Sequence, residues 1–310
     1  MSIDFYSQIS RNKKMTYFLF LAFFILIGFL AYVFSSILEF VFGIGFIFIF
    51  SIFGFLTIVF AVVAYYSSDK IVVAASGAKE ATVEQFKQLH NIVEELCLAS
   101  GLPKPKIFFI NDSAINAFAT GRDPQHAVVC VTIGCLSRLN REQLQGVLAH
   151  ELTHIKNYDV RTMTVATVLV GIAVMLSDFL LRMFLFGSFR SGNSKNSGGI
   201  EIALIVLALV LAILTPIIAK LISLSISRKR EFSADAGAAE ITRNPEGLAS
   251  ALELISKDTE VLEAANKATA HLYIADPLKN TKGLWLKSLF NTHPPIKERI
   301  SVLRGQKVQI

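Results

Sequence analysis

Four long apolar runs limit what this chain can fold into more than any other feature. The first run extends from Met15 to Leu38 and the second from about Phe42 to Tyr66, and neither contains a charged residue. About 20 apolar residues are enough to span a bilayer as a helix. The first run is long for the apolar part of a signal peptide and is followed at once by the second, so we interpret it as an anchor. Residues 15–66 are therefore predicted to form a transmembrane helical hairpin.

The third and fourth runs, at about residues 163–186 and 202–219, predict a second hydrophobic hairpin over residues 163–222. The third run contains Asp178 and Arg182, which are costly in lipid. Because they are four residues apart, they can pair on one face of a helix. These two runs either span the bilayer or form two buried apolar helices, and the sequence leaves both arrangements open.

Basic residues predict the side of the membrane on which the polar parts of the chain lie. If the third and fourth runs both span the bilayer, or if neither does, residues 1–14, 67–162 and 223–310 all lie on the same side of the membrane. Cationic flanks of membrane helices face the cytoplasm, and the flanks here contain Arg11, Lys13, Lys14, Arg228, Lys229 and Arg230. We therefore expect a cytoplasmic N-terminus at residues 1–14, and a cytoplasmic domain whose two parts are residues 67–162 and 223–310.

The composition excludes an ordinary cytosolic enzyme. Apolar residues make up 53% of the chain and charged residues only 17%, whereas soluble domains contain about 25% charged residues. The formal net charge is +6, but no stripe of lysine and arginine with interleaved aromatic residues is present. We therefore assign the positive charge to contact with anionic lipid, and we expect the lipid bilayer, and no nucleic acid, as a partner.

The cytoplasmic domain is predicted to combine helices with a small sheet. A T-x-x-Q capping box at Thr82–Gln85 predicts the start of one helix, and Asn140 with Gln143 predicts the start of another. Strands are expected at residues 107–110, 114–120 and 127–133. Asn244-Pro245 and Pro294-Pro295 can each open a later helix. The predicted fold is a mainly α integral membrane protein with two hydrophobic helical hairpins and an α+β cytoplasmic domain.

The second of these helices contains the sequence His150-Glu151-Leu152-Thr153-His154. Residues four apart lie on one face of a helix, so His150 and His154 can bind one metal ion, for which zinc is the usual occupant. Glu151 falls beside the pair, where it can accept a proton from a water activated by the metal. Such a short motif also occurs by chance, so the rest of the chain must support it.

A catalytic zinc site normally has three protein ligands, and the third candidate is Glu231. The sequence after His154 lacks the continuation that would supply another histidine, so the third ligand is expected beyond the apolar hairpin. Glu231 and Asp235 lie four residues apart in E-F-S-A-D. Glu231 would bind the metal, and Asp235 would accept a hydrogen bond from a ligand histidine. The alternative is a solvated acidic pair after a basic cluster.

Spacing along the helices predicts where this site lies. His154 precedes the third apolar run by about eight residues, or roughly 12 Å of helix. Glu231 follows the fourth run by five to twelve residues, or roughly 8–18 Å. Two antiparallel helices that leave the membrane together would present both groups at similar depth. The site is therefore expected just above the cytoplasmic membrane surface.

Four motifs together resemble the HtpX-type membrane metalloproteases, which are gluzincins related to the CaaX prenyl proteases. The motifs are H-E-L-T-H, E-F-S-A-D, N-A-F-A-T-G at residues 116–121 and T-H-P-P at residues 292–295. They occur in the family's order, and the resemblance covers nearly the whole chain. It implies a zinc endopeptidase of the bacterial or archaeal cytoplasmic membrane that acts in quality control of misfolded or damaged membrane proteins, a stress-response role.

The resemblance also implies a role for each matching residue. His150, His154 and Glu231 would bind one Zn²⁺ ion, with Glu151 as the general base. His293 would lie near the metal and stabilise the oxyanion, and Arg299 would pair with Asp235. An extended substrate would pair with an edge strand, which consists of Asn116, Ala117, Phe118, Ala119 and Thr120. The expected partners are polypeptide substrates, in particular membrane proteins.

Three other functions are alternatives to this one. A non-enzymatic membrane scaffold with a structural metal would commonly use a closed, cysteine-rich site, but Cys97, Cys130 and Cys135 lie outside the ligand segments. An ion transporter would place its ligands inside the apolar runs, and here only Asp178 and Arg182 fit. A prenyl protease acting on C-a-a-X substrates stays open, although four apolar runs and the small size fit the HtpX type better.

Overall fold

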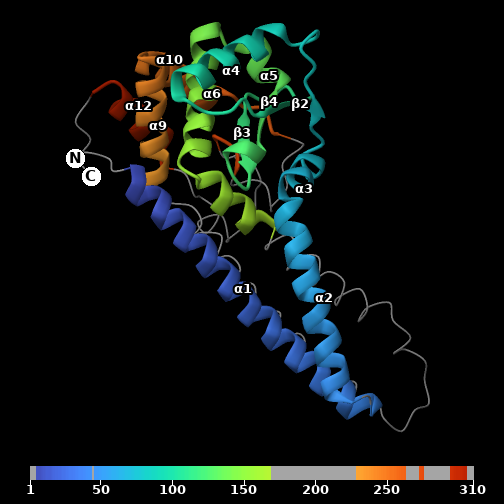
Figure 1. Ribbon diagram of the computed structural model, residues 1–310. Coiled ribbons are helices and arrows are strands. Elements are labelled where there is room, and N and C mark those ends of the chain that lie inside the picture. Colours follow the sequence, from blue (N-terminus) through green and yellow to red (C-terminus); the bar gives the residue numbers. More distant parts are fainter. Residues whose placement is uncertain (1–4, 44, 169–227, 263–271, 276–293, 306–310) are drawn as a thin grey trace.

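The computed structural model of the chain describes residues 5–43, 45–168, 228–262, 272–275 and 294–305. A long helical hairpin extends from one side of a mixed α/β domain, as Figure 1 shows. The proposed second hairpin, with Asp178 and Arg182, lies almost wholly outside the described residues. Only its beginning is seen, in a helical segment at residues 159–168.

The hairpin consists of helix α1 (Phe5–Phe42) and helix α2 (Phe46–Tyr66). Both contain a segment long and apolar enough to cross a membrane, at Ile9–Phe29 and Phe46–Tyr66. The predicted pair of apolar helices is confirmed, but α1 begins at residue 5, because no helix-breaking residue separates the polar start from the apolar run. With 38 residues, α1 is about 57 Å long and exceeds the ~30 Å hydrocarbon core of a bilayer.

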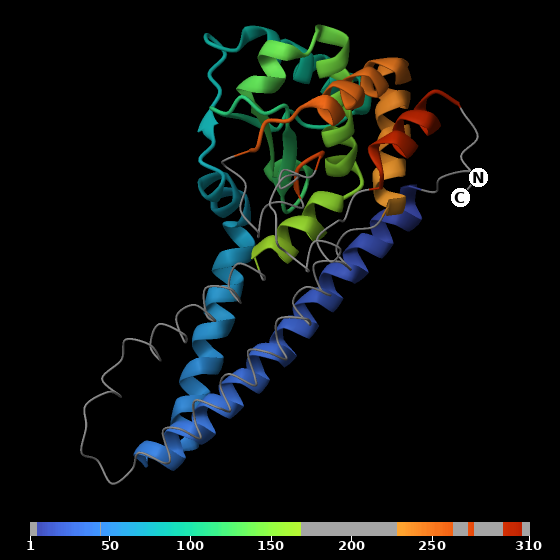
Figure 2. The same ribbon diagram turned by 180° about the vertical axis from the view of Figure 1, so that it is seen from behind.

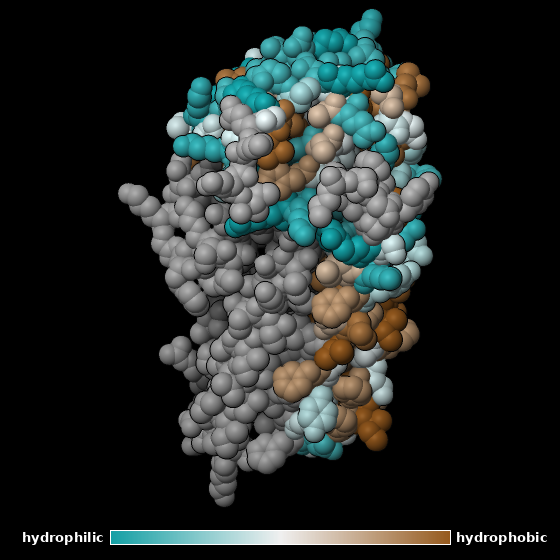
Figure 3. Space-filling view, turned by 90° about the vertical axis from the view of Figure 1, so that its left-hand side faces the viewer, coloured by the Kyte–Doolittle hydropathy of each residue, from teal (hydrophilic) through white to brown (hydrophobic). Residues whose placement is uncertain are grey.

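The surface of the hairpin differs from that of the domain. On the face seen in Figure 3, apolar side chains predominate along the coloured part of the hairpin and polar side chains along the far end of the domain. The exposed large apolar residues of α2 cover the side that faces away from its buried residues Ile49, Ala61 and Ala64, and they include Ile47, Phe48, Phe55, Leu56, Ile58 and Val62. A helix whose outward side is apolar is suited to lipid rather than to water.

Helix α3 (Ser68–Ala75) connects α2 to a four-stranded sheet. The strands lie in the order β1 (Lys79–Glu80), β2 (Lys106–Ile110), β4 (Ala127–Thr132) and β3 (Ala117–Gly121). The β2–β4 pair is parallel and the other two pairs are antiparallel. The three predicted strands are present, but β3 begins at 117 because Asp112 and Asp258 accept the N–H groups of residues 114 and 115.

Six helices and a 3₁₀ turn complete the described domain. They are α4 (Lys87–Ser100), η1 (Pro124–His126), α5 (Ile133–Arg138), α6 (Arg141–Lys156), α9 (Arg228–Thr242), α10 (Pro245–Lys257) and α12 (Ile296–Leu303). The predicted capping box at Asn140 and the predicted N-cap at Asn244 are confirmed. The box at Thr82–Gln85 is wrong: α4 begins at Lys87, and the Thr82 carbonyl instead accepts the Phe86 N–H in a turn.

Helix α6 lies at the centre of the domain. It packs against β3 and β4 on one side and against α9 and α10 on the other. Glycine allows two of these approaches: a side chain at Gly146 would meet the Leu248 backbone of α10, and one at Gly237 of α9 would meet Thr153. The contact at Gly237 lies next to the end of the H-E-x-x-H motif, so it brings α9 close to the two histidines.

Candidate metal centre

Three chemically active side chains of α6 are buried in the domain. His150, Glu151 and His154 are each at most 4% exposed. Burial of such polar groups is unfavourable unless each finds a partner. The i, i+4 spacing places both imidazoles on the same side of the helix, and their Nε2 atoms lie 3.2 Å apart.

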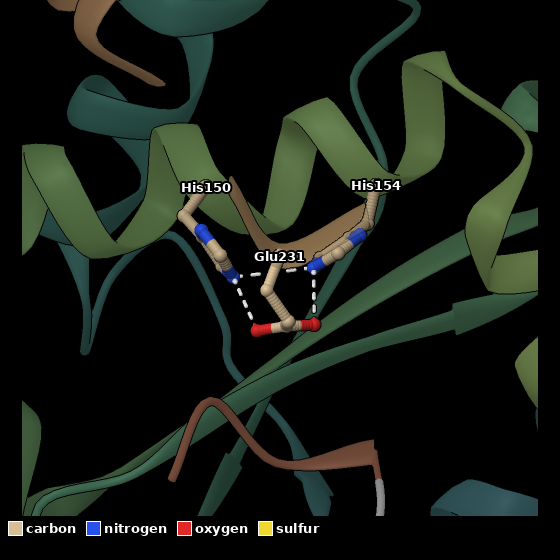
Figure 4. A group of neighbouring side chains, drawn as sticks. All are labelled: His150, His154 and Glu231. Carbon is tan, nitrogen blue, oxygen red and sulfur yellow. Dashed lines mark hydrogen bonds and ion pairs between the residues drawn. The ribbon is translucent and has the colours of Figure 1, made fainter. Parts of the chain in front are cut away.

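Glu231, in the first turn of α9, faces this pair of imidazoles. Its Oε2 lies 3.8 Å from His150 Nε2 and its Oε1 lies 3.6 Å from His154 Nε2. One ligand atom from each residue lies within 4.8 Å of the others, and the three side chains converge on one point in Figure 4. The structure thus brings together the three residues that the sequence analysis selected as ligands, although they are up to 81 positions apart.

A carboxylate fixes the orientation of each imidazole. His150 Nδ1 lies 2.9 Å from Asp235 Oδ1, and His154 Nδ1 lies 3.1 Å from Asp159 Oδ2. Each carboxylate favours the tautomer with its proton on Nδ1. When both imidazoles are neutral, as metal binding requires, the two Nε2 lone pairs face one another and the Glu231 carboxylate.

This donor set fits a divalent metal ion. Three electron-rich atoms directed at one point repel one another unless a cation lies between them. A tetrahedral zinc with Zn–N bonds of about 2.0–2.1 Å would hold two nitrogens roughly 3.3 Å apart, and the two Nε2 atoms are 3.2 Å apart. Two histidines and one carboxylate form one of the ligand sets of catalytic zinc.

Asp235 is held in turn by Arg299 from α12. Arg299 Nε lies 2.9 Å from Asp235 Oδ2 and its Nη2 lies 2.7 Å from Oδ1. Burial alone would raise the pKa of Asp235, but Arg299 and His150 outweigh burial and hold the pKa below its usual range. The structure therefore brings Arg299 and Asp235 together as a fully buried, bidentate ion pair.

Asp159 was not selected from the sequence. It lies five residues beyond His154, after a turn in which Tyr158 has a φ of 59°, an unusual value for a residue other than glycine. That turn directs the carboxylate back onto the end of α6, where Arg230 Nε also lies 3.5 Å away. One signal in the sequence could have identified Asp159. It is a charged residue between the helix that contains H-E-x-x-H and the third apolar run, and a charged group buried there requires a partner.

The surroundings shift the pKa values of the motif in different directions. Burial raises the pKa of Glu151 to about 7, partly opposed by His154 and by the backbone N–H of Ala119. Burial, with Arg299, lowers the pKa of His150 to about 4. Burial also disfavours a charged His154, but the hydrogen bond that His154 Nδ1 donates to Asp159 and the carboxylate of Glu231 outweigh it and raise the pKa to about 9.

The predicted substrate strand is the edge strand β3, and it packs against α6. All five residues of β3 are buried. The Ala117 carbonyl accepts the N–H of Ile274, and Asn116 Nδ2 donates to the Ala275 carbonyl at 3.1 Å. Residues 272–275 therefore cover one end of this edge. His293 lies outside the described residues, which resume at Pro294.

Comparison with known proteins gives concordant results. Residues 83–307 match the family model "Peptidase family M48". The chain is 46% identical to a "Protease HtpX homolog" of Dictyoglomus turgidum over 97% of this chain and 94% of that one. It is 38% identical to another from Streptococcus thermophilus over 96% and 99%. A crystal structure of S. mikatae Ste24p superposes with a TM-score of 0.48 at 23% identity, over 88% of this chain and 61% of that one.

Proposed function

Because the chain belongs to peptidase family M48 and is a membrane-associated metalloprotease, we propose that it is a zinc endopeptidase in which His150, His154 and Glu231 hold one Zn²⁺ ion. The observation that carries this assignment is the convergence of three buried donor atoms within 4.8 Å, contributed by two separate helices. Membership in a peptidase family also separates the chain from the scaffold and the ion transporter considered above.

The proposed chemistry is hydrolysis of a peptide bond with Glu151 as the general base. When bound, zinc supplies Lewis acidity that polarises the scissile carbonyl and acidifies water. Glu151 accepts the proton of the attacking water and passes it to the leaving amine. Its pKa of about 7 suits both steps, because a general base works best when its pKa lies near the operating pH.

The neighbouring charges are proposed to keep the ligands in place during this chemistry. Asp235 and Asp159 hold the Nδ1 atoms of the two histidines, and Arg299 balances the charge of Asp235. We retain for His293 the role that the family resemblance implies, stabilisation of the oxyanion. Such stabilisation is usually a large part of catalysis.

An extended substrate is proposed to pair with Asn116–Thr120. The backbone N–H of Ala119 lies close enough to Glu151 to lower its pKa, so a peptide along this edge would lie beside the general base. The Ala117 end of the edge is already bonded to Ile274. We therefore expect substrate binding to shift residues 272–275.

We further propose that the protein is a multi-pass protein of the bacterial cytoplasmic membrane with its active site on the cytoplasmic side. Its substrates would be misfolded or damaged membrane proteins, in a quality-control and stress-response role. The apolar hairpin and the basic residues at its start support the location. The buried ligands lie in the domain to which both ends of that hairpin connect, close to the expected membrane surface.

The proposed function is tested with purified full-length protein in detergent. Addition of Zn²⁺ to metal-free protein should start cleavage of an unfolded membrane protein, and self-cleavage where the protein acts on its own copies. Glu151→Gln should retain bound zinc and lose turnover, whereas His150→Ala should lose both. Cleavage by Glu151→Gln at the wild-type rate would refute the mechanism, and equal zinc content in His150→Ala would refute the ligand assignment.

A further inference from the structure

Asn12 is an unusual residue in the first part of α1. It is 1% exposed, while its neighbours Arg11, Lys13 and Lys14 are exposed. Three cationic residues are costly in hydrocarbon, so this part of α1 must lie at or above the membrane surface. Figures 1 and 2 show the start of α1 beside the lower end of α9, where the domain meets the hairpin.

The side-chain amide of Asn12 is bonded to the segment that follows α6. Its Nδ2 donates to the Asn157 carbonyl at 2.9 Å and to Asp159 Oδ1 at 2.7 Å. The other oxygen of Asp159, Oδ2, lies 3.1 Å from His154 Nδ1. A continuous chain of polar contacts therefore runs from the membrane helix through Asp159 to an imidazole of the metal centre.

A second set of contacts from α1 holds the same turn. Tyr158, between the two acceptors of Asn12, has left-handed backbone geometry, which residues other than glycine adopt only where their surroundings impose it. The Lys13 ammonium lies 5.2 Å from the centre of the Tyr158 ring, and the Arg161 guanidinium lies 5.6 Å from it. The turn that places Asp159 is thus fixed by groups on both sides of it.

We propose that Asn12 is a positioning residue for the metal centre: it holds Asp159, which orients His154, so the N-terminal membrane helix sets the affinity of the protein for its metal. This inference rests on the proposed function, because it requires that His154 bind the metal. An amide suits this position because its two N–H groups match one carbonyl and one carboxylate. An aspartate there would bring a second carboxylate against Asp159.

The alternative is that Asn12 only attaches α1 to the domain. Thr16, one helical turn further along α1, offers a matched control for that role. Thr16 is 4% exposed, and its Oγ1 lies 3.3 Å from Thr162 Oγ1 of the same helical segment as Asp159. Its Oγ1 also donates to the backbone carbonyl of Asn12 at 2.9 Å, but not to the side-chain amide that holds Asp159. Thr16→Val therefore removes a comparable buried contact between α1 and the domain but leaves Asp159 held.

The test measures Zn²⁺ affinity of full-length protein in detergent, by competition with a chromophoric chelator at fixed pH. Loss of a carboxylate that supports a metal ligand weakens metal binding about 10–100-fold, which we expect for Asp159→Ala. Asn12→Leu should weaken binding by about 3–10-fold, the effect of one or two lost hydrogen bonds. Asn12→Asp should weaken it at least as much, and Thr16→Val should stay within about 2-fold of wild type.

A double variant separates positioning from attachment. If Asn12 acts through Asp159, Asn12→Leu should have little further effect on Zn²⁺ affinity in the Asp159→Ala background. At saturating Zn²⁺, Asn12→Leu should recover the wild-type kcat and KM, which a damaged fold would not. Equal Zn²⁺ affinities of Asn12→Leu and Thr16→Val would overturn the inference. Failure of the wild type to bind Zn²⁺ would instead overturn the proposed function.

Discussion

Among single residues, Glu151 combines burial with a proposed role as general base, which requires charge. Its pKa is raised from 4.5 to about 7, mainly by burial, so the folded protein binds this proton more tightly than the unfolded chain does. The stabilisation is fully present below about pH 4.5 and is lost as the pH rises through about 7, a change of about 3 kcal/mol. The proposed general base is therefore a group that costs stability at neutral pH.

The first prediction follows from this cost. Glu151→Gln should raise the Tm of metal-free protein at pH 8, where the wild-type carboxylate is charged and buried. At pH 4.5 the two proteins should have nearly the same Tm, because both side chains are then neutral. Thermal unfolding in chelator-containing buffer at the two pH values measures the difference. A Tm increase of the same size at both pH values would contradict the assignment of this difference to the buried charge of Glu151.

The second prediction concerns Arg299. When one partner of a buried ion pair is removed, the other charge stays buried without a partner and the protein is destabilised. Arg299→Met would leave the Asp235 carboxylate buried without its cation, which costs about 3–5 kcal/mol. The Tm should fall by many degrees, and Zn²⁺ affinity should fall as well, because Asp235 orients His150. Arg304→Met is the control: Arg304 pairs with Glu246 and Glu253 at the surface, where ion pairs contribute little, so its Tm should hardly change.

The residues of the site divide into those that the sequence could predict and those that it could not. His150, His154 and Glu231 follow from ligand chemistry and helical spacing. Asp159 and Asn12 follow from neither, because the contact of Asp159 with His154 depends on the Tyr158 turn, and the contacts of Asn12 depend on the packing of α1 against that turn, over 145 or more positions of sequence. Contacts of that kind leave no periodic pattern in the sequence.

For the helices and strands, local sequence signals predicted the boundaries correctly where no tertiary contact opposed them. The Asn140 capping box has both of its hydrogen bonds. The similar pattern at Thr82 failed because the segment before α4 forms a turn that follows the β1 strand, where Ala81 N–H donates to the Ile107 carbonyl. Pairing with β2 thus took precedence over the local helix signal. Tertiary contacts of this kind set helix boundaries that propensity alone cannot predict.

The packing of α9 on α6 carries the third prediction. A Cβ at Gly237 would meet the side chain of Thr153, which is stiff because it is β-branched. Gly237→Ala should therefore destabilise the protein by about 1–3 kcal/mol through overpacking, and it should weaken Zn²⁺ binding by moving Glu231. Thr153→Ala removes the obstructing atoms, so the double variant should regain much of the lost stability and much of the lost Zn²⁺ affinity. Chemical unfolding and chelator competition measure the two effects.

Gly146 provides the contrast for that experiment. A Cβ there would meet the backbone of Leu248 and not a side chain. No side-chain substitution in α10 can make room for this Cβ. The loss of stability in Gly146→Ala should therefore persist when it is combined with any substitution in α10. If Thr153→Ala rescued Gly146→Ala as well as Gly237→Ala, the rescue would reflect general stabilisation rather than relief of one contact.

In the whole molecule, the candidate metal centre lies in the domain near the point where the apolar hairpin meets it. The start of α1 contacts the turn beside His154, while α2 continues through α3 towards the sheet. The same hairpin that would anchor the protein therefore contacts the segment that carries a metal ligand. The continuous apolar runs of the sequence predicted the anchor, whereas the contact of the first turns of α1 with the candidate site depends on a helix longer than a bilayer requires.

The orientation of this assembly carries the last prediction. Glu39, near the end of α1, is exposed, and so is Gln88 in α4, on the opposite side of the proposed membrane. In spheroplasts, Glu39→Cys should react with a membrane-impermeant maleimide, whereas Gln88→Cys should react only after lysis. The wild type is the background control, because Cys97, Cys130 and Cys135 are buried. Labelling of Gln88→Cys alone in intact spheroplasts would invert the topology. Labelling of both only after lysis would mean that the hairpin does not cross the membrane.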